Sequence, residues 1–177
     1  MQPGLGVGHT DHMTDPTPDT SILSAKILTV SDGVIAGTRI DASGQALDDH
    51  LSRAGWTVVG RRQVADGVES VAEALVDMST DFNGLIVTTG GTGFGPRDLT
   101  PEGTRAVLER DAPGMAEAMR LCNDRGLGRL SRAVAGTRGR CLIVNTPGST
   151  RGAVETLDAV LDIIPHAVEL LGGGRPH

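Results

Sequence analysis

Residues 84–98 read GLIVTTGGTGFGPRD, and this stretch decides the fold class of the chain. Its first half is a short apolar run, as expected for a strand that is buried on both faces of a parallel sheet. Its second half is a glycine-rich loop that follows the strand without a break. A ligand-binding loop directly after a buried strand is typical of α/β proteins.

Strand-like and helix-like segments alternate on both sides of this stretch. Residues 27–30 and 141–145 are two further buried-type strands, and residues 56–64 favour another. Apolar residues at helical spacing lie between these strands. The predicted helices cover residues 43–54, 68–76, 100–110 and 114–125, with a last helix from about residue 152.

This order predicts an α/β fold with three layers, in which helices cover both faces of a mostly parallel sheet. Two glycines within residues 133–140 predict a small antiparallel hairpin. Ser43 and Thr100 are the predicted N-caps of the helices that they begin. Pro165 is expected to start a separate last turn or to kink the final helix.

Composition and charge narrow the range of functions. The 177 residues suit one domain, predicted over residues 25–172, with a disordered tail at residues 1–24 and a short tail at residues 173–177. A net charge of −6 and an aromatic content of 2% disfavour nucleic acid as a partner. There is no apolar run of about 18 residues for a membrane span, and no signal-peptide pattern, so a cytoplasmic protein is expected.

Three loops are predicted to meet at one edge of the sheet. They are Ser31-Asp32-Gly33, Thr88–Asp98 and Asn145–Thr150, each directly after a buried strand. The carboxyl ends of parallel strands lie at the same edge, so the loops can share one pocket. Glycines in the middle loop would let backbone N–H groups approach a phosphate, although a plain glycine-rich turn also explains them. The loop fits neither the P-loop nor the dinucleotide glycine pattern.

Two carboxylates are candidates for chemistry at this edge. Asp98 could hold Mg²⁺ next to phosphates, or it could form an ion pair with Arg97 or Arg105. Asp66 could act in the site, or it could cap the helix that follows. Ser31-Asp32 could be a simple turn, and Ser149 could be only an N-cap.

Taken together, the loops resemble the molybdopterin adenylyltransferase family, also called the Mog/MoaB or gephyrin G-domain-like family of molybdenum cofactor biosynthesis. The resemblance covers about residues 26–172. Its most specific part is Thr88-Thr89-Gly90-Gly91-Thr92-Gly93 with Arg97-Asp98-Leu99-Thr100-Pro101-Glu102 behind it. Supporting parts are residues 28–32, residues 112–115 and Asn145-Thr146-Pro147-Gly148-Ser149.

The resemblance implies an enzyme that transfers AMP from ATP to the terminal phosphate of molybdopterin with Mg²⁺, releasing pyrophosphate. It implies Asp66 and Asp98 as the functional carboxylates, with Asp98 holding the metal. It also implies a homotrimer or a hexamer, and a molybdate insertase as a candidate partner. The implied ligand-binding residues are Ser31, Asp32, Thr89, Gly90, Gly91, Thr92, Gly93, Arg97, Pro147, Gly148 and Ser149.

Other functions remain open at the level of sequence. Segments 131–136 and 147–151 resemble a branch of the family that lacks the Arg-Asp pair, whereas this chain keeps Arg97-Asp98. A non-catalytic molybdopterin-binding protein is therefore one alternative. A related nucleotide pyrophosphatase-type domain is a second, and a gephyrin-like scaffold is a third.

Overall fold

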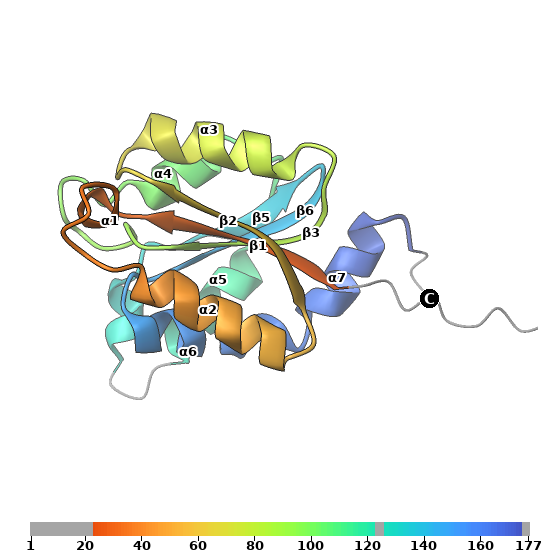
Figure 1. Ribbon diagram of the computed structural model, residues 1–177. Helices are drawn as coiled ribbons and strands as arrows, with labels where there is room; N and C mark the ends of the chain where they lie inside the picture. Colours follow the sequence, from red (N-terminus) through yellow and green to blue (C-terminus); the bar gives the residue numbers. More distant parts are fainter. Residues whose placement is uncertain (1–22, 123–125, 175–177) are drawn as a thin grey trace, which may run out of the picture.

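The computed structural model describes residues 23–122 and 126–174, and Figure 1 shows a central sheet with helices on both faces. The sheet has six strands in the order β2-β1-β3-β6-β5-β4. Strands β2, β1, β3 and β6 run parallel, whereas β5 and β4 are antiparallel to their neighbours. The strands are β1 Ser24–Val30, β2 Thr57–Val64, β3 Asn83–Thr89, β4 Arg110–Asp111, β5 Ala135–Arg138 and β6 Arg140–Thr146.

Helices form the two outer layers. Helices α3 and α4 lie on one face of the sheet, and α2, α5 and α6 lie on the other (Figure 1). The described helices are α1 Asp32–Ile35, α2 Ala42–Arg53, α3 Val68–Ser79, α4 Thr100–Arg105, α5 Pro113–Leu121, the 3₁₀ helix η1 Leu127–Leu130, α6 Thr150–Leu161 and α7 Ile164–Leu171. None of these is long and apolar enough to cross a membrane.

The core consists of two apolar clusters, one on each face of the sheet, because successive side chains of a strand point to opposite faces. Leu85 and Val87 of β3 pack with residues of α2, α5, α6 and α7, whereas Ile86 packs with residues of α3. Successive side chains of a strand point to opposite faces, so a continuous apolar run fills both clusters. The predicted three-layer α/β class is therefore confirmed, and so is the antiparallel hairpin, which is formed by β5 and β6.

Some predicted helix ends were wrong. Helix α2 is capped by Asp41 instead of Ser43, because the Asp41 carboxylate accepts from the Gly44 N–H at 2.9 Å and from Thr29 Oγ1 at 3.0 Å. Thr100 is the first residue of α4 and Leu99 is its N-cap. Helix α4 ends at Arg105 rather than at residue 110, because Arg110 already belongs to the edge strand β4.

Most other predicted boundaries hold to within three residues. As predicted, a separate short helix, α7, forms at this point, and Pro165 is its second residue. Strand β1 begins at Ser24, so the sheet starts at the last residue of the predicted tail. Residues 123–125, at the end of a predicted helix, and most of the two predicted tails lie outside the described residues.

The strand ends that carry the three loops lie side by side. Thr29 pairs with Thr89 across β1 and β3, and Thr89 pairs with Thr146 across β3 and β6. Val30 pairs with Val64 at the end of β2, just before Asp66. All four strands therefore end at one level, where their loops start together.

Candidate functional site

A cavity of about 870 Å³ opens at this edge of the sheet. A volume of several hundred Å³ is typical of small-molecule and cofactor sites. The loops after β1, β3 and β6 all contribute to its wall, as the sequence predicts, and the residue Asp66 after β2 joins them. Eleven of the thirteen predicted site residues line it, namely Ser31, Asp66, Thr89, Gly90, Gly91, Thr92, Gly93, Asp98, Pro147, Gly148 and Ser149.

The glycines at the start of the middle loop are required by the backbone. Gly90 and Gly91 have φ angles of +100° and +63°, in the left-handed region that favours glycine. A Cβ on Gly90 would overlap the Val30 carbonyl oxygen, and one on Gly91 would overlap Thr100 Oγ1. The close packing of the loop against β1 and α4 thus explains these two glycines without any ligand.

The backbone N–H groups of this loop differ in availability. The Gly90 N–H donates to the Thr146 carbonyl at 3.1 Å, so it is already used. Among the described residues, no hydrogen bond is donated by the N–H groups of Gly91, Thr92 or Gly93. Since these three residues line the cavity, their N–H groups can bind an anion there.

A buried polar network supports the loop from below. Asn145 Nδ2 donates to Thr88 Oγ1 at 3.0 Å and to Thr104 Oγ1 at 2.9 Å. Thr89 Oγ1 donates to the Pro147 carbonyl at 2.9 Å, joining the loop after β3 to the loop after β6. Buried polar groups whose hydrogen bonds are all satisfied favour a single conformation, so the two loops keep a fixed position relative to each other.

Asp66 is fixed by an exchange of hydrogen bonds with Asp32. Asp66 Oδ2 accepts from the Asp32 N–H at 2.8 Å, and the Asp66 N–H donates to Asp32 Oδ1 at 3.0 Å. Gly67 is the N-cap of α3, and that helix has no side-chain cap. Asp66 is therefore not the helix cap that was its alternative interpretation.

Asp32 and Arg97 lie beside the cavity rather than in its wall. The Arg97 guanidinium pairs with both carboxylate oxygens of Asp32, and its Nη2 donates to the Asp66 carbonyl at 2.6 Å. The hydrogen bond from Arg97 is the main reason why the pKa of Asp32 lies below its ordinary value. Both residues hold Asp66 in this structure.

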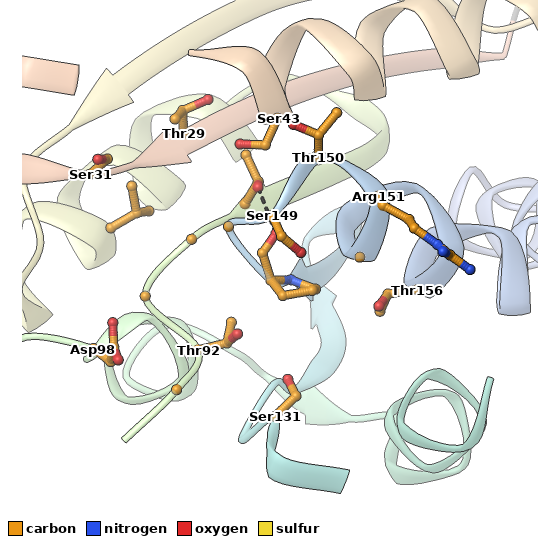
Figure 2. Close-up of a pocket in the computed structure, with 18 of the residues that line it drawn as sticks. Thr29, Ser31, Ser43, Thr92, Asp98, Ser131, Ser149, Thr150, Arg151 and Thr156 are labelled. Atoms are coloured by element: carbon orange, nitrogen blue, oxygen red, sulfur yellow. Dashed lines mark hydrogen bonds between the residues drawn. The ribbon is translucent and has the colours of Figure 1, made fainter. Parts of the chain in front are cut away.

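Asp98 lines the cavity beside the glycine loop (Figure 2). Its Oδ2 accepts from the Gly95 N–H at 2.8 Å, and its own N–H donates to the Gly95 carbonyl at 3.0 Å. Arg97 is engaged with Asp32, so it is not the ion-pair partner of Asp98. Each of the two candidate carboxylates thus has its Oδ2 fixed by a backbone N–H.

The opposite wall comes from the starts of two long helices. Ser43 near the start of α2 and Thr150 at the start of α6 both face the cavity in Figure 2. Ser149 occupies the N-cap position of α6, but its side chain makes no capping hydrogen bond. The first turn of α6 has no side-chain cap and offers N–H groups and partial positive charge, so this part of the wall also favours an anion.

Sequence reasoning missed several residues of the site. Thr29, Asp41, Ser43 and Thr156 line the cavity, and Arg132 holds the loop from behind. The signal for Thr29 is in the sequence, because its position just before the end of a buried strand puts it at the loop edge. No sequence signal points to Arg132, because its partners, two backbone carbonyls and the Glu102 carboxylate, lie at least 30 residues away in the chain.

The acidic groups could bind a metal ion only together with a ligand. Within residues 23–122 and 126–174, no cluster of three or more His, Cys, Asp or Glu side chains could hold a metal ion. Mg²⁺ commonly takes one or two carboxylates and completes its shell with phosphate oxygens and water. Asp98, at the cavity wall next to available N–H groups, fits that type of site.

Comparisons with known proteins show the family to which the chain belongs. The family model described as "Probable molybdopterin binding domain" matches residues 26–166. A protein of Helicobacter pylori strain J99 named molybdopterin adenylyltransferase is 36% identical over 152 residues, which is 83% of this chain and 86% of that protein.

Two solved structures are similar over nearly their full length. The molybdopterin biosynthesis enzyme MoaB from Thermus thermophilus has a TM-score of 0.79 and 43% identity, covering 87% of this chain and 98% of that one. The molybdopterin biosynthesis Mog protein from Mycobacterium ulcerans has a TM-score of 0.77 and 38% identity, covering 84% and 99%. Because the family model spans most of the chain and the sequence identity is high, the chain belongs to the molybdopterin-binding-domain family of molybdenum cofactor biosynthesis.

Proposed function

We propose that this chain transfers AMP from ATP to the terminal phosphate of molybdopterin and releases pyrophosphate. In this reaction a phosphate oxygen of molybdopterin attacks the α-phosphorus of ATP. A new phosphoanhydride bond forms as the bond between the α-phosphorus and the bridging oxygen breaks, and pyrophosphate leaves with that oxygen. The attacking phosphate is already anionic near neutral pH, so no general base is required.

One observation carries this proposal. Asp66, Asp98 and the glycine loop line one cavity, and within the described part of the chain the N–H groups of residues 91–93 donate no hydrogen bond. Nucleotidyl transfer depends on alignment of two anionic groups and on neutralisation of their charge. The site supplies N–H donors for phosphate oxygens and carboxylates for a cation.

Each part of the site has a role in the proposal. The N–H groups of Gly91, Thr92 and Gly93 bind phosphate oxygens, and the first turn of α6 binds a second anionic group. Asp98 would hold Mg²⁺, which when bound neutralises charge on the phosphates. Asp66 positions the attacking phosphate or a second ion. Asp32 and Arg97 support Asp66, which modifies their expected role as ligand-binding residues.

The test is to incubate the purified chain with molybdopterin, ATP and Mg²⁺. We expect an AMP–molybdopterin adduct by chromatography and one pyrophosphate for each adduct in a coupled assay. Neither product should form when Mg²⁺ is chelated.

The alternatives give different results in the same assay. A folded chain that binds molybdopterin but releases no pyrophosphate would be a binding protein. Hydrolysis of ADP-ribose without any adduct would indicate a pyrophosphatase-type domain. The expected homotrimer or hexamer, the molybdate insertase partner and the cytoplasmic location stay predictions.

A further inference from the structure

Arg132 lies between η1 and β5, behind the glycine loop, and does not line the cavity. Its Nε donates to the Gly93 carbonyl at 2.7 Å, and its Nη2 donates to the Asp98 carbonyl. Its backbone N–H donates to the Thr92 carbonyl at 2.9 Å. One residue therefore binds the carbonyl groups at both ends of residues 93–98, which we name the Gly93–Asp98 turn.

The guanidinium is held in place by a charged partner on another element. Both carboxylate oxygens of Glu102 in α4 accept from Arg132, through Nη1 and Nη2. The two side chains are 28% and 36% exposed, so the ion pair is partly shielded from solvent. Partial burial by itself raises the pKa of Glu102, but the hydrogen bond and charge of Arg132 outweigh this effect and leave the pKa below its ordinary value. Glu102 therefore stays ionised at neutral pH and keeps the guanidinium oriented.

The turn itself determines where the Asp98 carboxylate points. Asp98 Oδ2 is bonded to the Gly95 N–H inside the turn, so its direction follows the shape of the turn. Gly93 and Gly95 restrict their own backbone little, because glycine has wide conformational freedom. The hydrogen bonds from Arg132 supply the restriction that the glycines lack.

We propose that Arg132 is a positioning residue for Asp98, acting through the Gly93–Asp98 turn and oriented by Glu102. The role of Asp98 in AMP transfer rests on the proposed function above, whereas the control of the turn by Arg132 does not. Lysine can replace the charge of Arg132, but a single ammonium group cannot reproduce the planar set of donors.

The first measurement is backbone hydrogen exchange of residues 92–98 without ligands, in the wild type and in Arg132→Met. We expect faster exchange of the Gly95 and Asp98 N–H groups in the variant, because the turn opens more often. Arg62→Met is the matched control, since Arg62 forms an ion pair with Asp77 away from the cavity. Unchanged exchange of the turn in Arg132→Met would overturn the proposal.

The second measurement is the kinetics of adduct formation. Loss of a residue that orients a metal-binding or catalytic group typically costs about 10- to 100-fold in activity or metal affinity, so we expect Arg132→Met to lower kcat or to raise the Mg²⁺ requirement by such a factor. Arg132→Lys should recover part of this loss, and Arg62→Met should behave as the wild type. A change in the KM for molybdopterin alone would contradict a role through Asp98.

A double-mutant comparison separates positioning from general structural damage. In the Asp98→Asn background, Arg132→Met should add less than about a threefold further loss, because residues that act as one unit are not additive. An equal loss in both backgrounds would show that Arg132 supports the fold generally and would overturn the proposal. If Arg132→Met does not fold, Arg132→Lys and Glu102→Gln are the variants measured instead.

The two proposals can fail separately. A wild type that forms no adduct would remove the proposed enzyme function. In that case the exchange of residues 92–98 in Arg132→Met still decides whether Arg132 controls the turn.

Discussion

Asp66 and Asp98 are held by the same kinds of hydrogen bond, but the arginines that hold them differ in solvent exposure. In each case a backbone N–H binds the carboxylate Oδ2 and an arginine binds the main-chain carbonyl. Arg97 performs the second task for Asp66, and Arg132 performs it for Asp98. Two carboxylates from distant parts of the chain are thus held by the same kind of contact.

The two arginines differ in their exposure to solvent. The Arg97 and Asp32 side chains are 62% and 45% exposed, whereas those of Arg132 and Glu102 are 28% and 36% exposed. Exposed ion pairs are screened by water and salt and contribute little. The position of the Asp66 carboxylate should therefore depend mainly on the two hydrogen bonds between Asp66 and Asp32. The position of the Asp98 carboxylate should depend mainly on Arg132.

The largest effect is expected when the carboxylates themselves are changed. Asp98→Asn should lower kcat about 100-fold or more, because charge stabilisation in the transition state is lost. The dissociation constant for molybdopterin should change less than about threefold, since the N–H donors remain. The measurement is steady-state adduct formation together with a direct binding titration.

Asp66→Asn, measured in parallel, shows whether the two carboxylates are equivalent. A loss confined to KM would assign Asp66 to positioning of molybdopterin alone. Unchanged turnover in Asp98→Asn would remove Asp98 from the mechanism.

Effects of intermediate size are expected from glycine substitutions near each carboxylate, at Gly91 and at Gly93. Gly91→Ala should destabilise the fold by roughly 1–3 kcal/mol, because the residue has a positive φ and its Cβ would overlap Thr100 Oγ1. In Gly93→Ala the new Cβ would lie 2.9 Å from Asp98 Oδ2, a side-chain atom that can move. This second variant should keep its stability but lose activity, because the carboxylate is displaced.

Thermal denaturation and adduct formation measured on both variants check this difference. A Gly93→Ala enzyme with full activity would show that the position of Asp98 Oδ2 is not critical.

The smallest effect concerns the exposed pair of Asp32 and Arg97. The pKa of Asp32 is depressed below its ordinary 3.8, chiefly by the hydrogen bond from Arg97. The stabilisation from this pair is therefore fully present above the ordinary pKa, and it is lost as the pH falls through the lower pKa of the folded state. Urea unfolding of the wild type and Asp32→Asn, from neutral pH to about pH 3 and below, should show a small difference that shrinks in acid. A difference that is constant with pH would mean that Asp32 acts only through its neutral hydrogen bonds.

Sequence alone predicted the edge of the sheet where the site lies. The apolar runs before Ser31, Gly90 and Pro147 identified three buried strands, and parallel strands must end at a common edge. The cavity confirms that inference, because residues from all three loops line it. Asp66 and Asp98 were placed by the family resemblance, and the structure brings both to that cavity.

The residues that hold these two carboxylates in place could not be predicted from the sequence. Arg97 is next to Asp98 in sequence, yet it pairs with Asp32, which is 65 residues away. The N-cap of α2 is another example. Ser43 was predicted, but Asp41 is the cap, and its carboxylate also accepts from Thr29 on strand β1, a contact that the sequence does not indicate.

Local patterns in the sequence are enough to predict the layers, the parallel strands and the loops that gather at their ends, because burial patterns and glycine clusters act over a few residues. Which arginine holds which carboxylate depends instead on how distant segments pack together. Arg132 reaches the Asp98 carbonyl across 34 residues of chain. A backbone carbonyl carries no residue identity, so a contact of this kind exists only once the loop, α4 and the segment before β5 have packed together.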